Sequence, residues 1–262
     1  MTLADTLLRI DRGTRWTLVE TLPLPFDVRH PQGMARVDGV WWISTVDTEE
    51  RSGWVLAVDG LSGALLDRIP VGDATRFHPG GMDFDGAALW VACAEYRPRS
   101  SATIARLVPG ERTTEVAFAV DDHVGAVVRL GVGGDLVGWT WGSRHFKRWR
   151  LDGTEVLDVR NPGHFVDHQD GQWLPDGDLV LCGGVGANSL GGVGVLRGFD
   201  LTMLREVPFP ERSPMSGRAA TQNPSFAEVV DDLVVVHVLP DDGVAGAILS
   251  YSTPVRTAMP PR

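Results

Sequence analysis

Four histidines recur along the chain at intervals of about 45 to 50 residues, and each precedes a short apolar segment. They are His30, His78, His123 and His168, and Asn223 takes the corresponding place in the last interval. Imidazole can bind a transition metal or transfer a proton near neutral pH. If the positions are structurally equivalent, the fold should bring the four rings together in one site.

The segments that follow these residues repeat one plan, and this plan predicts the fold. The stretch from His78 to Gly86 contains a tight turn, a short strand and a second turn, and Leu89 to Ala92 follows as the next strand. A repeat of about 45 residues with several short strands is typical of a β-propeller. The sequence predicts an all-β chain, with residues 1–262 forming a single five-bladed β-propeller domain. Six blades, one of them degenerate, are the alternative.

Four blades are expected at residues 30–71, 78–118, 123–159 and 168–209, and a fifth begins at Asn223. The fifth blade supplies only three strands. The alternating segment from Trp16 to Leu22 is expected to pair into this last blade as its missing fourth strand. Such closure would remove the free sheet edges that promote aggregation.

The innermost strand of each blade lines the axis of a propeller, so the four histidines and Asn223 should reach the central channel at one level. Imidazole ligands suit a divalent transition metal, namely Fe, Zn, Mn or Cu, better than calcium or magnesium. Asp122 and Asp167 directly precede two of the histidines. We expect them to point away from the site and to orient imidazoles from behind. Two other interpretations stay open: a metal-free polar channel for a ligand, and histidines that only bridge neighbouring strands.

The loops after the second strand of each blade should emerge on the same face as the histidines. The candidate catalytic residues in these loops are Glu95, Tyr96 and His145. The candidate substrate-binding residues are Arg97, Arg144, Asn188 and Asn223. Carboxylate, phenol and imidazole groups can transfer protons, whereas guanidinium and amide groups can anchor a polar or anionic substrate. His237, by contrast, lies in an apolar run and is expected to be a core residue with its nitrogens satisfied.

Composition limits the possible partners. The net charge is −10 and Lys147 is the only lysine, so nucleic acid and anionic membranes are not expected partners, because both require a basic surface. A small-molecule substrate is expected, and the oligomeric state is not predicted. The N-terminal residues lack the plan of a signal peptide, and Cys93 and Cys182 lie in apolar strand patterns. A cytoplasmic protein with buried free thiols is therefore expected.

Two hairpin sequences resemble those of a known class of propeller. They run from Asp83 to Val91 and from Trp173 to Leu181, and they are similar to the inner hairpins of gluconolactonase-like and strictosidine-synthase-like propellers. The resemblance implies a propeller fold. Those lactonases hold calcium with carboxylate and amide oxygens, whereas here the equivalent positions are mostly histidine, with Asn223 as the only amide. The set of four histidines resembles instead the iron site of carotenoid-cleaving oxygenases.

The expected function is that of a metal-dependent enzyme acting on a small organic, possibly anionic, substrate at the central channel. The metal held by the histidines would act as a Lewis acid in lyase, isomerase or hydrolase chemistry. A non-haem iron oxygenase that uses the same four histidines is one alternative. A propeller that binds a ligand or serves as a scaffold without catalysis is the other.

Overall fold

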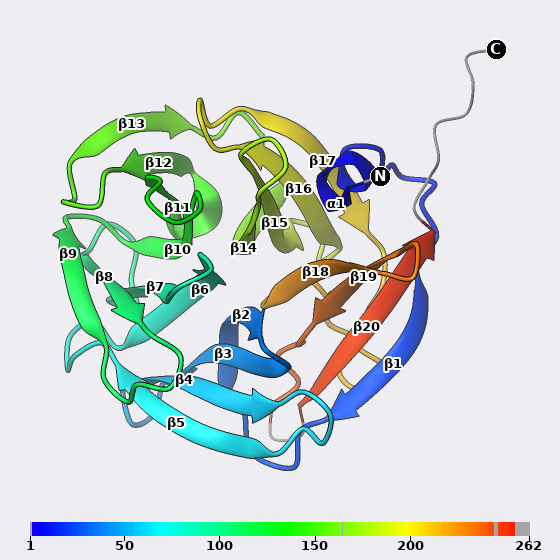
Figure 1. The fold of residues 1–262 in the computed structure, drawn as a ribbon, viewed down its shortest axis with the longest axis horizontal. Coiled ribbons are helices and arrows are strands. Elements are labelled where there is room, and N and C mark those ends of the chain that lie inside the picture. Colours follow the sequence, from blue (N-terminus) through cyan, green and yellow to red (C-terminus); the bar gives the residue numbers. More distant parts are fainter. Residues whose placement is uncertain (1, 164, 244–245, 255–262) are drawn as a thin grey trace.

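The computed structural model describes residues 2–163, 165–243 and 246–254. Its strands form consecutive antiparallel units of four, arranged around a common centre (Figure 1). The units contain β2 (His30–Val37), β3 (Val40–Asp47), β4 (Ser52–Asp59) and β5 (Leu65–Val71); β6 (His78–Phe84), β7 (Leu89–Ala94), β8 (Ala102–Leu107) and β9 (Glu115–Val120); β10 (Val124–Arg129), β11 (Leu136–Thr140), β12 (His145–Trp149) and β13 (Glu155–Arg160); and β14 (Val166–Leu174), β15 (Leu179–Gly186), β16 (Gly191–Arg197) and β17 (Met203–Phe209). The fold is all-β and propeller-like, as the repeats predict.

The last unit combines both ends of the described chain. Its strands are β18 (Ser225–Val230), β19 (Leu233–Val238), β20 (Ala247–Pro254) and the N-terminal β1 (Thr17–Pro23). β1 pairs antiparallel with β20, from Thr17 opposite Ser252 to Pro23 opposite Ala247. This pairing gives β20 a neighbour on its outer side, so that its backbone groups do not form a free edge.

Tight hairpins set the register within the units. In the β2–β3 hairpin, Val37 pairs with Val40, and only Asp38 and Gly39 lie between them. Both have positive φ angles, 48° and 80°, which is the backbone conformation that two-residue hairpins require and that an Asp-Gly pair adopts readily. The Asp38–Gly39 turn recognised in the sequence therefore fixes the register of this hairpin.

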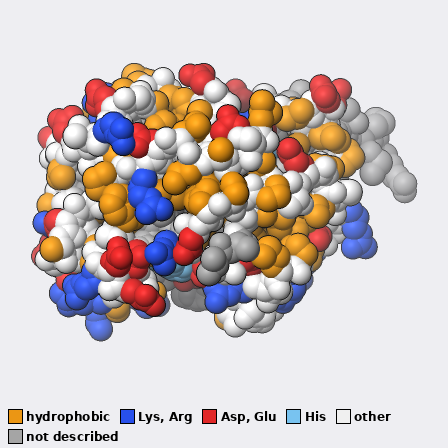
Figure 2. Space-filling view, turned by 90° about the horizontal axis from the view of Figure 1, so that it is seen from below, with side chains coloured by type: hydrophobic (Ala, Val, Ile, Leu, Met, Phe, Trp, Pro, Cys, Tyr) orange, Lys and Arg blue, Asp and Glu red, His pale blue; other side chains and the backbone are white. Residues whose placement is uncertain are grey.

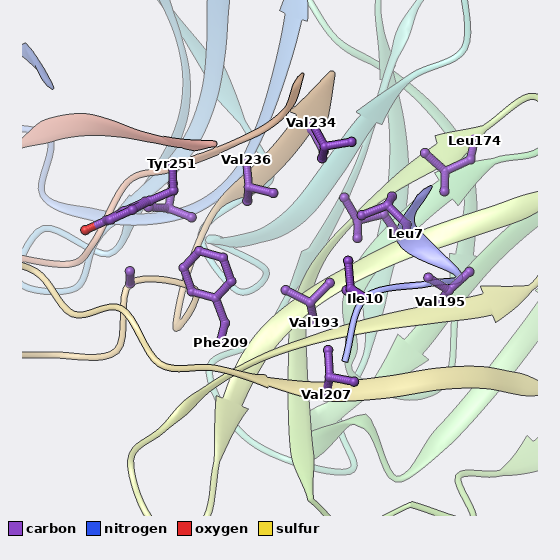
Figure 3. Close-up of a cluster of buried hydrophobic side chains, with 14 of the residues drawn as sticks. Leu7, Ile10, Leu174, Val193, Val195, Val207, Phe209, Val234, Val236 and Tyr251 are labelled. Atoms are coloured by element: carbon purple, nitrogen blue, oxygen red, sulfur yellow. The ribbon is translucent and has the colours of Figure 1, made fainter. Parts of the chain in front are cut away.

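Hydrophobic side chains fill the spaces between successive units. One such cluster, shown in Figure 3, joins the β14–β17 unit to the last unit, and Val193 and Phe209 face Val236 across it. Leu7 and Ile10 of the N-terminal segment pack into the same cluster. Leu7 ends the short helix α1 (Leu3–Leu7), which starts with a capping box. Packing between units thus holds the ring of sheets together.

Glycines let the inner strands touch near the centre. A Cβ atom on Gly80 would lie 2.0 Å from the carbonyl oxygen of Gly125, and one on Gly81 would lie 2.7 Å from that of Gln169. Any larger residue would collide with neighbouring backbone there. The approach is close enough for Gly81 of β6 to pair in parallel with Ala126 of β10, which links the second and third units.

A buried carboxylate ties several units together at the same level. Asp170 of β14 is fully buried, and it accepts hydrogen bonds of 3.0 Å from the backbone N–H groups of Met34, Met82 and Ser225. These residues belong to three other units. Burial raises the pKa of Asp170, and the three N–H donors act in the opposite direction. One side chain thus satisfies backbone donors that face the axis and have no strand partner.

The described residues contain no helix that is long and apolar enough to cross a membrane. Cys93 and Cys182 are free and buried, as their apolar surroundings in the sequence predict.

Candidate functional site

A cavity of about 290 Å³ lies at the end of the molecule where the inner strands begin. Its walls include His30, His78, Tyr96, His123, Asp167 and Asn223. Figure 2 shows a histidine in a recess between acidic and basic side chains, at the lower edge of that view. The repeat therefore brings inner-strand residues from several units to one hollow.

Three of the predicted imidazoles stand side by side in this cavity. His30 begins β2, His78 begins β6, and His123 directly precedes β10. The centroid of the His78 ring lies 6.1 Å from that of His30 and 6.1 Å from that of His123. Equivalent places in three successive repeats thus give three neighbouring rings, with His78 in the middle.

His78 is the most enclosed of the three. It is 6% exposed, and neither of its ring nitrogens has a hydrogen-bond partner in the described protein. Its ring stacks on Tyr96, with centroids 4.5 Å apart and an interplanar angle of 8°. Burial, together with the charges of His123 and His30, lowers the pKa of His78 to about 3. The ring is neutral at physiological pH, so one of its nitrogens is a hydrogen-bond donor and the other an acceptor.

His123 is held by the loop that follows β7. Its Nδ1 lies 2.9 Å from the carbonyl oxygen of Glu95, so this partner assigns the proton to Nδ1. Nε2 then presents a lone pair. The ring meets Trp141 edge-on, with centroids 4.7 Å apart. Burial lowers the pKa of His123, and the bond to Glu95 acts in the opposite direction. These features favour a neutral imidazole ready to accept a proton.

His30 is oriented by a carboxylate instead. Its Nδ1 lies 3.1 Å from Oδ2 of Asp241, which also receives a 2.5 Å bond from Arg218. Burial acts to raise the pKa of Asp241, but the bonds and charges of His30 and Arg218 outweigh it, so that the pKa is lowered. A carboxylate behind one imidazole nitrogen fixes the orientation of the ring.

The fourth predicted histidine, His168, also belongs to the wall of this cavity, but its ring does not join the other three. The ring of His168 packs near Trp139 and Phe146, with centroids 6.5 and 6.1 Å away, and its Nε2 lies 3.3 Å from Oε2 of Glu206. The inner strands of the first three repeats also contain a register irregularity, which in β2 and β10 lies two residues after the histidine. In β14 it lies one residue after His168. Because side chains alternate along a strand, this displacement by one residue changes which side chain faces the cavity.

Asp167 lines the cavity beside His168. It was expected to point away, yet it lines the cavity, and its Oδ1 is buried without a hydrogen-bond partner. The sequence held a signal for this shift. An apolar residue follows four positions after each of the other three histidines, at positions 34, 82 and 127, whereas the residue four positions after His168 is Gln172.

Of the other predicted residues, Tyr96 and Asn223 reach the cavity. Asn223 is buried and donates from Nδ2 to the carbonyl oxygen of Pro31 at 2.5 Å. Glu95 contributes only its backbone, because its carboxylate accepts bonds from Arg97 and Ser101.

The remaining candidates lie outside the cavity. His145 pairs with Asp158 on the exterior of its unit, with 2.7 Å between Nδ1 and Oδ1. Arg144 is exposed and lines an adjoining recess. Asn188 is exposed in the turn between β15 and β16. His237 is buried and both its nitrogens are bonded, to Ser250 and Glu228, as expected for a core residue.

The described residues contain no group of three or more His, Cys, Asp or Glu side chains placed to hold a metal ion. His30, His78 and His123 are neighbours, but their nitrogens do not converge on one point as they stand. As placed, the cavity offers separate hydrogen-bonding and proton-accepting groups: the imidazoles, the Tyr96 phenol and the Asp167 carboxyl.

The buried state of His78 predicts a pH-dependent stability. Below pH 6.5 the unfolded chain binds a proton at this residue, whereas the folded chain does not until about pH 3. The free energy of unfolding should therefore fall as pH falls, by about 2 kcal/mol between pH 7 and pH 5 through this residue. Urea denaturation of the wild type and of His78→Gln at both pH values measures the difference. His145→Gln, at an exposed position, should keep the wild-type dependence; an unchanged dependence in His78→Gln would contradict the prediction.

Comparison with known proteins gives a family and a fold. A model of the family described as "Family of unknown function (DUF6454)" matches residues 2–257. No curated protein matches the sequence. Among solved structures, the chain resembles a luciferin-regenerating enzyme with a TM-score of 0.51 and 10% identity, covering 88% of this chain and 82% of the other.

Two further solved structures are larger than this chain. The tail fibre of Staphylococcus aureus phage P68 has a TM-score of 0.55 and 10% identity, covering 92% of this chain and 53% of the other. The hydrazine synthase of Kuenenia stuttgartiensis has a TM-score of 0.49 and 12% identity, covering 88% of this chain and 59% of the other. The chain therefore spans little more than half the length of either. At such low identity the likeness shows the fold alone, which is β-propeller-like in these neighbours.

Proposed function

The chain belongs to DUF6454, a family of unknown function, and we propose that it is an enzyme that acts on a small polar organic molecule by proton transfer in the histidine cavity. The observation that carries the proposal is the set of three adjacent imidazoles, two of which have Nδ1 fixed by an acceptor and Nε2 left free. Oriented imidazoles of this kind are the usual groups of general acid–base catalysis. The similar luciferin-regenerating enzyme supports only the statement that this fold can carry an enzyme.

The roles follow from the surroundings of each group. His123 takes a proton from the substrate at Nε2, because its Nδ1 proton is already bonded to the Glu95 carbonyl. His30, backed by Asp241, returns a proton to the product. Proton removal at one atom and delivery at another is the chemistry of lyases and isomerases, and activation of water by the same base gives a hydrolase.

A screen of purified protein against lyase, isomerase and hydrolase substrates tests this proposal. Any turnover found should be lost in His123→Gln and kept in His145→Gln, a change of the same residue type outside the cavity. Turnover that survives in His123→Gln would refute the assigned role. If ligands bind in the cavity without any turnover, the protein is a binding propeller and not an enzyme.

Metal-assisted catalysis is the second candidate. The observation that favours it is His78, whose two ring nitrogens are both buried and unpartnered beside two further imidazoles. Fe, Zn, Mn or Cu would bind there only after the rings of His30 and His123 rotate toward His78.

Calorimetric titration with Zn²⁺ separates metal-assisted catalysis from proton transfer without a metal. The proton-transfer proposal expects activity to survive dialysis against EDTA. The metal-assisted mechanism would be established if EDTA abolishes activity, metal restores it, and His78→Ala no longer binds Zn²⁺. Dependence of the activity on Fe²⁺ and O₂ would indicate an oxygenase.

We also propose that the fold is a single five-bladed propeller closed by β1. The sheet orders support this: each unit contributes four strands, and β1 completes the last unit beside β20. A hydrophobic cluster that contains Leu22, Met34 and Ile248 joins this last unit to the first.

A further inference from the structure

Asp167 is the one aspartate or glutamate among the described residues in the walls of the cavity, and no lysine or arginine lines it. Burial raises the pKa of Asp167, whereas the charges of His168 and Arg144 act in the opposite direction. The nearest predicted anchors for an anion lie elsewhere: Arg97 is bonded to Glu95, and Arg144 lines the adjoining recess. The whole chain also has a net charge of −10. An anionic substrate would thus meet a carboxylate and find no counter-charge in the cavity.

Two hydrogen-bond acceptors in the walls are left without a donor by the described residues. Nε2 of His123 is left as an acceptor by the bond that its Nδ1 makes to Glu95. Oδ1 of Asp167 is buried with no partner. An unpaired buried carboxylate oxygen is costly, and a ligand with N–H donors would remove that cost.

Aromatic faces complete the cavity. Tyr96 is stacked on His78 and is 48% exposed. Trp141 also lines the cavity, and the centroids of these two rings lie 5.9 Å apart. The face of an aromatic ring attracts cations. Tyr96 and Trp141 thus strengthen the preference for a cationic ligand that Asp167 creates.

The geometry points to a ligand that carries a positive charge and N–H donors, such as a primary amine in its ammonium form, bound between Asp167, the imidazoles and the aromatic pair. This inference rests on the proposed function of the cavity and names its substrate class. It replaces the anionic substrate expected from the sequence. The ammonium group would donate to the carboxylate of Asp167, and the rest of the molecule would lie against Tyr96 and Trp141.

Matched probes test the inference by binding alone. Benzylamine, benzyl alcohol and benzoate share one skeleton, as do 1,4-diaminobutane, 1,4-butanediol and succinate. Calorimetry and thermal shift should show that the amines bind at least about 10-fold more tightly than their alcohol or carboxylate counterparts, which corresponds to about 1.4 kcal/mol. Asp167→Asn should remove this preference. Glu49→Gln, which deletes an equal charge at an exposed position outside the cavity, should keep it.

Three results would overturn the inference: carboxylates or alcohols that bind as tightly as the amines, amine binding that is unchanged in Asp167→Asn, or no amine bound at millimolar concentration. A failure of the proposed enzyme function would give results different from these three. Amines that bind through Asp167 without any turnover keep the ligand class and reject the enzyme. Turnover of an anionic substrate that depends on His123 keeps the enzyme and rejects the ligand class.

Discussion

Replacing Asp170 with alanine should lower the free energy of unfolding by about 3–5 kcal/mol. The carboxylate is fully buried and serves the backbone N–H groups of Met34, Met82 and Ser225 in three different units. Its removal leaves all three donors buried without an acceptor, and each such donor costs about 1–3 kcal/mol. Urea denaturation followed by tryptophan fluorescence measures the change.

The matched control is Asp176→Ala, an exposed residue just beyond the end of the same strand. It should change the free energy of unfolding by less than about 0.5 kcal/mol. If Asp170→Ala does not fold, Asp170→Asn provides the measurement, because the amide keeps one acceptor oxygen and the shape of the side chain. A loss below about 1 kcal/mol in both variants at position 170 would contradict the role given to this carboxylate.

Replacing His123 with glutamine should reduce kcat by about 10²- to 10⁴-fold on any substrate that the enzyme turns over, with little change in KM. The reason is that glutamine keeps the size and polarity of the side chain but cannot take up a proton. Burial lowers the pKa of His123 below the ordinary histidine value of 6.5. The wild-type rate should therefore be retained below pH 6.5 and fall only when the imidazole becomes protonated.

Steady-state kinetics between pH 4 and pH 8 measure both effects. The residual activity of His123→Gln should not fall at low pH as the wild-type rate does. His145→Gln should keep both the wild-type kcat and the fall in rate at low pH. A variant that loses substrate binding while retaining kcat would show that His123 only binds the substrate. A wild-type rate that already falls well above pH 6.5 would assign the titrating group elsewhere.

The architecture was predictable because it is repeated. Short apolar strands bounded by Asp/Gly turns recur at a fixed period. In the Asp38–Gly39 hairpin the turn requires positive φ at both residues, which explains the choice of residues there. A repeat that departs from the pattern does not hide it, because several other repeats share the pattern. The all-β, propeller-like fold could therefore be read from the sequence before any side chain was placed.

The site was predictable only where the repeats stay in register. The rings of His30, His78 and His123 are neighbours in one cavity, whereas the ring of His168 packs away from them and Asp167 joins the wall. The register irregularity of β14 lies one residue nearer to its histidine than those of β2 and β10, and such a displacement leaves no clear trace in turn spacing. The loop candidates depended on local partners that the sequence does not reveal: Arg97 and Ser101 occupy the carboxylate of Glu95.

The contact between the inner strands determines how molecules reach the site. Gly81 pairs with Ala126, a Cβ on Gly80 would strike the carbonyl of Gly125, and Asp170 binds backbone at the same level. The axis is therefore blocked beneath the histidines, and no molecule can reach them along the axis from the opposite face. Substrate must enter and product must leave on the histidine face, so a product that leaves slowly would compete with incoming substrate there.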